Sequence, residues 1–174
     1  KDYALHSNKK NFEFNQKAIE LAKNLNKSMA IAEAYGNYGY YYERKNDTLK
    51  QLELLDKIIE LGNKEKNNDV LGKGYYEKGF YYWGRSSQTK TIQNFLKAEE
   101  FFTKSKNKKY LSEVFIQLGY YYQEDIRDYN KALGYYKKYT DLFDENSFAL
   151  VTTYDLMAEL YGKQNKYEKS LEYY

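Results

Sequence analysis

The sequence predicts an all-α fold built from antiparallel helix pairs, and two observations predict it. One pattern recurs about every 40 residues along most of the chain. Within each copy, apolar side chains return at the three- and four-residue spacing of a helix, and the alternation typical of strands is absent. Each copy has room for two helices, so we expect well over half of the residues to be helical.

The repeat is clearest where glycine and tyrosine occur together. It reads "GNYGYYYE" at 36–43, "YEKGFYYW" at 76–83, "IQLGYYYQ" at 116–123 and "DLMAELYG" at 155–162. Gly39, Gly79, Gly119 and Ala158 occupy the same slot. Because glycine costs about 1 kcal/mol inside a helix, its recurrence there indicates that the two helices of a pair approach closely at this slot.

The elements follow in order along one continuous array over residues 1–174. An orphan second helix occupies 11–27, and three full repeats occupy 28–67, 68–107 and 108–146, followed by a truncated fourth at 147–174. Each repeat carries an amphipathic stripe on both of its helices. The second half of the third repeat aligns with the others only after one residue is inserted. Proline is absent, so joints rich in Asn, Asp and Ser must make the turns.

The composition argues against catalysis. Cysteine is absent and the single histidine, His6, lies in the N-terminal stub, so neither a thiol nucleophile nor a histidine-based dyad can form. The glycines of "GKGYYEKG" (72–79) are too far apart to cradle a phosphate and lie on a predicted helix. We therefore expect a protein that is not an enzyme and that uses neither a cofactor nor a metal.

The charge pattern restricts the partners. Lysine and arginine number 28 against 25 acidic residues, and the densest basic patch, "KSKNKK" at 104–109, is interpreted as a solvated helix end. We expect no nucleic-acid binding by this segment. No apolar run approaches the ~20 residues of a membrane helix, so no membrane insertion is expected. The compartment stays open between the cytoplasm, which we favour, and the periplasm of a membrane-anchored sensor.

The repeat resembles the tetratricopeptide repeat (TPR) over essentially the whole chain. The segment 115–142 carries nearly all of its pattern: Phe115, Leu118, Gly119, Tyr122, Asp128, Tyr129, Ala132 and Tyr136. The middle repeats depart from it, with Lys78 in the leucine slot and Gln51 and Thr91 in the small-residue slot. The unit is also longer than the usual ~34 residues, as in bacterial regulatory proteins. The resemblance implies a right-handed superhelical solenoid with a concave groove.

That resemblance also implies which side chains line the groove. They are Tyr40, Glu43, Tyr76, Phe80, Trp83, Ile116, Tyr120, Gln123, Asp155 and Glu159. Aromatic anchors of this kind are typical of protein-binding hot spots, so we expect a protein or peptide ligand. The alternative for any one ring is burial against an adjacent repeat or packing by a longer parent chain. We favour binding for Trp83, because its slot holds Glu43, Gln123 and Gly162 in the other repeats.

Two further expectations concern the larger context of the chain. An alternative function is a sensory or regulatory segment of a larger bacterial signalling protein, such as a transcription regulator, a histidine kinase or a peptide receptor. Both ends of the array interrupt the repeat. Unfinished repeat ends expose apolar surface, so self-association through them is a second expected kind of contact.

Overall fold

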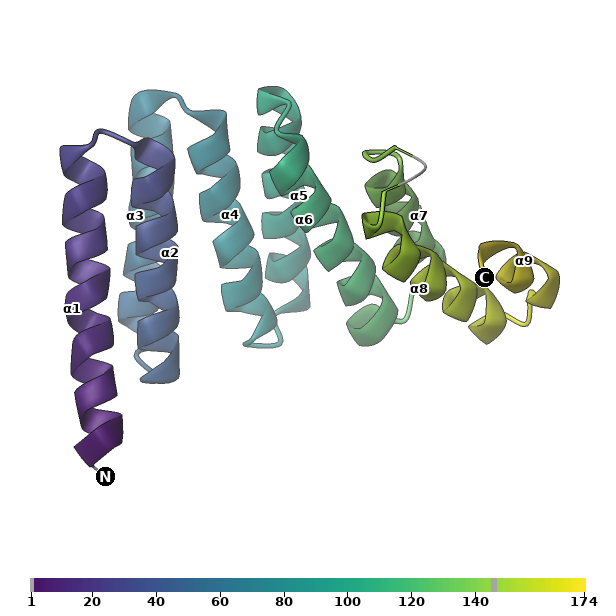
Figure 1. The fold of residues 1–174 in the computed structure, drawn as a ribbon, viewed down its shortest axis with the longest axis horizontal. Helices are drawn as coiled ribbons and strands as arrows, with labels where there is room; N and C mark the ends of the chain where they lie inside the picture. The colour runs from purple at the N-terminus through teal and green to yellow at the C-terminus, as the bar shows by residue number, and fades with distance from the viewer. Residues whose placement is uncertain (1, 145–146) are drawn as a thin grey trace. The chain divides into compact units, whose positions relative to one another are not determined.

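The computed structural model describes residues 2–144 and 147–174, and Figure 1 shows the helices in chain order. The described residues contain nine α-helices, one π-helix and no strand, which confirms the all-α prediction. Within each compact unit, helices that follow one another in sequence pack side by side. They form two compact units, Lys1–Asn107 (unit 1) and Lys108–Tyr174 (unit 2).

Unit 1 contains five helices, each packed on the next. They are α1 (Asp2–Asn24), α2 (Ser28–Arg44), α3 (Thr48–Glu65), α4 (Asn68–Trp83) and α5 (Gln88–Ser105). The core of α2, α3 and α4 is formed by Ala32, Leu55, Ile58, Val70 and Tyr81. In addition, α2 packs directly on α4, although α3 separates them in sequence. That contact gives α2 and α4 a shared face.

Crowding at Gly79 shows why the repeat needs a small residue. A Cβ atom there would lie 2.5 Å from Cε1 of Phe95 on α5, and the Phe95 side chain is fully buried. Two other glycines of α4 are equally crowded, Gly72 by Phe102 at 2.6 Å and Gly74 by Ile59 at 2.7 Å. The prediction of close helix contact at Gly79 is therefore confirmed.

Gly39, in the same slot of the preceding pair, is packed more loosely. A Cβ atom on Gly39 would meet the nearest atom, Cδ2 of Leu55, at an ordinary contact distance of 3.4 Å. The second helix of the pair places the aromatic Phe95 against Gly79 and the aliphatic Leu55 against Gly39, and only the aromatic ring crowds this slot.

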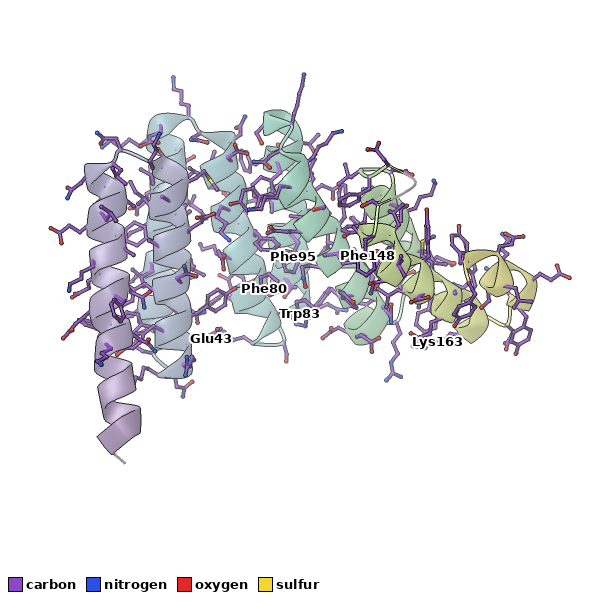
Figure 2. The ribbon with its side chains drawn as sticks, in the orientation of Figure 1. Glu43, Phe80, Trp83, Phe95, Phe148 and Lys163 are labelled. Atoms are coloured by element: carbon purple, nitrogen blue, oxygen red, sulfur yellow. The ribbon has the colours of Figure 1, made fainter. Side chains whose placement is uncertain are left out.

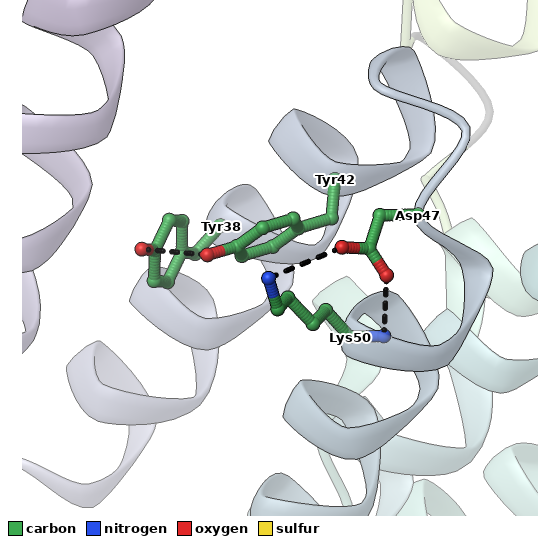
Figure 3. A network of polar contacts seen from close by, with 4 residues as sticks. All are labelled: Tyr38, Tyr42, Asp47 and Lys50. Atoms are coloured by element: carbon green, nitrogen blue, oxygen red, sulfur yellow. Dashed lines mark hydrogen bonds and ion pairs between the residues drawn. The ribbon is translucent and has the colours of Figure 1, made fainter.

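The turn between α2 and α3 closes a helix pair without glycine or proline (Figure 3). Asn46 takes the left-handed conformation with φ of 58°, and Asp47 then caps α3 by accepting a hydrogen bond from the Lys50 backbone N–H at 3.2 Å. The Lys50 ammonium lies 3.3 Å from the same carboxylate and 5.3 Å from the centroid of the Tyr42 ring. The Tyr42 and Tyr38 hydroxyls share a 3.1 Å hydrogen bond. Left-handed residues recur at the corresponding turns of the other helix pairs: Ser86, Arg127 and Asn165.

Unit 2 holds the remaining helices. They are α6 (Lys108–Tyr120), the π-helix η1 (Tyr121–Ile126), α7 (Tyr129–Thr140), α8 (Ala149–Lys163) and α9 (Tyr167–Tyr173). A Cβ atom on Gly119 of α6 would collide with the ring of Tyr136 on α7, and that ring is fully buried. Ala158, which takes the glycine slot in the α8–α9 pair, is also fully buried. The small slot thus has the predicted packing role in both pairs.

The extra residue of the third repeat lies in η1. The left-handed turn residue comes seven positions after the small residue at Gly39, Gly79 and Ala158, but eight positions after Gly119. A π-helix accommodates one additional residue within a helical turn. The insertion is therefore absorbed at the end of the first helix, and Asp128 still caps α7 through the Lys131 backbone N–H at 3.1 Å.

Several of the exposed apolar side chains lie on the first and last helices or next to them. On α1 they are Phe14, Leu21 and Leu25, the last just past the end of the helix, and on α9 and just after it they are Tyr167, Leu171 and Tyr174. These are the positions on which the expected self-association would depend. That expectation stays a prediction.

Candidate functional site

The strongest candidate site is the shared face of α2 and α4, called here the α2–α4 face. It is formed by Gly36, Tyr40 and Glu43 of α2 and by Lys73, Tyr76, Glu77, Phe80 and Trp83 of α4. Residues three and four positions apart lie on one stripe of a helix, and the two stripes meet because α2 packs on α4. Five of the ten predicted groove residues belong to this face.

A buried carboxylate lies at the centre of the α2–α4 face. Glu77 is only 5% exposed, and its Oε1 atom is 2.6 Å from the ammonium of Lys73 one turn earlier. The Tyr40 hydroxyl donates a second hydrogen bond to Glu77 from the neighbouring helix. Gly36 makes room for this carboxylate, since a Cβ atom there would lie 3.3 Å from Glu77 Cδ. A buried charge needs such partners, so the cluster fixes α2 against α4.

This cluster holds Tyr40 in place while leaving its ring accessible. Burial of the phenol, and next the negative charge of Glu77, raise the pKa of Tyr40 far above its ordinary value of 10.0. The hydroxyl is therefore neutral and acts as a donor to Glu77. About 40% of the Tyr40 surface stays exposed. An anchored ring with an open surface loses little conformational entropy when a ligand covers it.

Next to Tyr40 lies a supported pair of rings. Phe80 and Trp83 stack with centroids 5.9 Å apart and an interplanar angle of 13°. Both meet the buried Phe95 ring edge-to-face, at 5.3 and 6.2 Å. The Tyr76 ring also meets Phe80 edge-to-face, with centroids 5.0 Å apart. The two half-buried rings therefore form a rigid aromatic shelf whose orientation is set by α5.

Glu43 completes the face at the end of the two helices. Figure 2 shows Glu43 extending from α2 toward the end of α4 that carries Phe80 and Trp83. Its Oε1 atom lies 3.7 Å from the position that a Cβ atom would occupy on Gly84, the residue after Trp83. The Glu43 side chain is exposed. An accessible carboxylate thus borders the aromatic shelf.

Two predicted groove residues are buried inside their units. Tyr76, at 8% exposure, supports the shelf and lies under the Lys73 ammonium, which is 5.4 Å from the ring centroid. Gln123 is 4% exposed and accepts a 2.8 Å hydrogen bond from the Tyr136 hydroxyl. Its own amide donates to Glu124 at 2.7 Å. Gln123 lies in η1, so the extra residue changes the direction in which its side chain projects.

The other predicted residues of unit 2 do not form a comparable cluster. Ile116 is half-buried, and Tyr120 is half-buried with its ring 6.0 Å from Tyr136 in an edge-to-face contact. Asp155 and Glu159 are exposed on α8, where Glu159 forms an ion pair with Lys163 at 2.6 Å. Unit 2 therefore contributes surface residues, and the built polar and aromatic cluster lies in unit 1.

The predicted groove set did not include the central residue, Glu77. Its sequence signal is the Lys73–Glu77 spacing of four within an otherwise aromatic and glycine-rich helix. Such a pair normally lies on a solvated surface. Only the packing of Gly36 from α2 onto α4 buries it.

The described residues contain neither a metal-binding group of side chains nor a membrane-spanning helix. No group of three or more His, Asp or Glu side chains there could hold a metal ion, and the side chain of His6 lies outside the described part. No helix in the described residues has the length and apolar character needed to cross a bilayer.

Comparisons with known proteins give a fold likeness. The chain is similar to the crystal structure of BtubC (BKLC) from P. vanneervenii, with a TM-score of 0.73 and 14% sequence identity. The match covers 96% of this chain and 70% of that one. No protein-family model matches the sequence, and no curated protein matches it significantly. At this identity the likeness concerns the fold alone.

Proposed function

We propose that this chain is a non-catalytic binding scaffold of the TPR type, in which successive helix pairs build a solenoid and the α2–α4 face binds a protein or peptide segment. Three observations support the architecture: the 40-residue pattern, the packing of successive helices within each unit, and the small residues in the tightly packed slots of α4, α6 and α8. The fold likeness to BtubC supports the all-helical fold alone.

The observation that carries the binding proposal is the construction of the α2–α4 face. Tyr40 is anchored at its hydroxyl yet exposed at its ring, and the Phe80–Trp83 shelf is supported by a buried ring from another helix. Rigid, partly exposed aromatic side chains with buried polar support are typical of binding hot spots. A surface with only a packing role has no need of an anchored and exposed ring.

The test uses random linear peptides displayed on phage and selected on the immobilised chain. Enriched peptides are synthesised with a fluorophore, and their affinity is measured by anisotropy. We expect Tyr40→Ala and Trp83→Ala each to weaken binding about tenfold or more, as truncation of a hot-spot residue does. Leu49→Ala, an exposed change on α3 away from the face, is the matched control and should bind as the wild type does.

Melting curves of each variant distinguish lost binding from lost folding. Tyr40→Ala removes a ring that keeps about 40% of its surface exposed and leaves the Lys73–Glu77 pair, so the variant should keep most of the stability. Peptide affinity that is unchanged in both folded variants, or a failure to select any peptide, would contradict the proposal.

A further inference from the structure

We infer that the α2–α4 face takes a basic side chain of its ligand, arginine in preference to lysine, at the corner between Glu43 and the Phe80–Trp83 shelf. This inference rests on the proposed function and adds the chemistry of the ligand. It places the cation against the rings and within reach of the Glu43 carboxylate. Its support comes from charge, from space and from the way that the chain uses its own cations.

The α2–α4 face has a net negative charge, whereas the chain as a whole has a net positive charge. The whole sequence has a formal charge of +3, whereas the α2–α4 face carries two carboxylates, Glu43 and Glu77, and one ammonium, Lys73. Lys73 and Glu77 neutralise each other within the face. Among the described residues, no lysine or arginine forms an ion pair with Glu43. The carboxylate beside the shelf therefore attracts a cation from the ligand and repels phosphate.

The space beside Glu43 is kept open by Gly84. The corresponding positions in the other repeats carry long side chains, Arg44, Glu124 and Lys163, whereas this one has none. A Cβ atom on Gly84 would lie at ordinary contact distances, 3.6 Å from the Phe80 carbonyl oxygen and 3.7 Å from Glu43 Oε1. The backbone at Gly84 is also right-handed, with φ of −59°, so the glycine is not required by conformation. What the glycine provides is room at the corner.

The chain itself already places cations on its aromatic rings. The guanidinium carbon of Arg85 lies 3.7 Å from the centroid of the Tyr81 ring, and its Nη2 atom donates to Gln51 at 3.0 Å. One face of a guanidinium thus stacks on a ring while its edge donates to an oxygen. Indole is the strongest ring for cation–π contacts, and the planar arginine head can stack and donate to a carboxylate together. Trp83 and Glu43 offer a ligand the same two contacts.

The test replaces the basic residue of a selected peptide by its neutral isostere. Among phage peptides enriched on the wild-type chain, we expect arginine or lysine at one fixed position. Changing that arginine to citrulline keeps the shape and removes the charge, and it should weaken binding about tenfold, the size of a partly desolvated cation–π and carboxylate contact. Glu43→Gln in the chain should cost a similar factor.

A double-mutant cycle shows whether the two changes remove the same contact. If the peptide cation meets Glu43, the citrulline peptide should lose little further affinity on the Glu43→Gln chain. Gly84→Arg brings a cation into the corner and should weaken binding of the basic peptide. Gly84→Ala should bind that peptide nearly as the wild type does. Trp83 is the single tryptophan, so its emission reports directly on whether the peptide covers the shelf.

The outcomes separate this inference from the proposed function. Peptides that need Tyr40 and Trp83 but tolerate citrulline or Glu43→Gln would overturn the basic-residue inference and leave peptide binding standing. Peptides that bind the folded Tyr40→Ala and Trp83→Ala variants unchanged, or a library from which nothing is selected, would overturn both. If the losses of binding free energy caused by citrulline and by Glu43→Gln are additive, the two changes do not remove the same contact, and that result would also contradict the inference.

Discussion

At the scale of single residues, the space beside each glycine decides whether an added methyl group raises or lowers the free energy of unfolding. Gly119 and Gly134 lie on α6 and α7, which form one of the two helix pairs of unit 2. A Cβ atom on Gly119 would overlap the ring of the fully buried Tyr136, whereas nothing lies within 4 Å of one on Gly134. The two positions therefore form a matched pair that separates helix propensity from helix packing.

We predict opposite effects for the two alanine substitutions. Gly119→Ala should lower the free energy of unfolding by roughly 1–3 kcal/mol, because the ring of Tyr136 must shift. Gly134→Ala should raise it by up to about 1 kcal/mol, because alanine favours the helix. Denaturant unfolding followed by circular dichroism measures both. A neutral or stabilising Gly119→Ala would show that α6 and α7 do not approach as described.

The same scale shows which site residues could be predicted from sequence. Trp83 and Phe80 could be placed on one face, because a helical stripe follows from spacing alone. Glu77 could not, because its burial depends on Gly36, which is 41 positions earlier and on another helix. The burial of Tyr76 likewise depends on rings of other elements, such as Phe95 of α5. The spacing of residues within one helix does not predict where such rings lie.

At the scale of elements, η1 shows how one inserted residue changes a surface. The alignment of repeats revealed the extra residue but not whether it lies in the turn or in the helix. The extra residue lies in the helix, and this arrangement directs the Gln123 side chain inward. There its Oε1 atom accepts a hydrogen bond from the buried Tyr136 hydroxyl at 2.8 Å, which stabilises the arrangement. The resemblance to the TPR pattern implied a groove position for Gln123, because that pattern assumes an uninterrupted α-helix.

Deleting Asp125 should convert η1 into an α-helical turn. The turn residue would then follow Gly119 by seven positions, as it follows Gly39 and Gly79. We expect Gln123 to rotate outward and Tyr136 to lose its acceptor, with a loss of about 1–3 kcal/mol in the free energy of unfolding.

A second substitution tests the reason for that loss. Tyr136→Phe should be destabilising in the wild type, where it leaves Gln123 without its donor, and nearly neutral in the deletion variant. Denaturant unfolding of the four proteins gives the coupling free energy. Equal costs of Tyr136→Phe in both backgrounds would show that the π-helix does not serve this hydrogen bond.

At the scale of the whole molecule, the chain has 23 tyrosines, and those that are buried make the free energy of unfolding depend on pH in the alkaline range. Burial, as the largest cause, raises the pKa of Tyr136 and of Tyr38 above the ordinary value of 10.0. The unfolded chain then releases these protons at lower pH than the folded chain does. The stability that these phenols add is complete below about pH 10 and is lost as the pH rises above it.

We predict that the free energy of unfolding falls steeply above about pH 10, and that Tyr136→Phe makes this fall shallower. Phenylalanine has no proton to release, so its variant lacks the contribution of the buried phenol. Lysines also lose their charge in this range, so the exposed Tyr167→Phe serves as the matched control and should keep the wild-type slope. Guanidinium unfolding at a series of pH values gives the slopes. Identical slopes for Tyr136→Phe and Tyr167→Phe would mean that Tyr136 ionises as freely in the folded chain as in the unfolded one, contrary to its burial between α6 and α7.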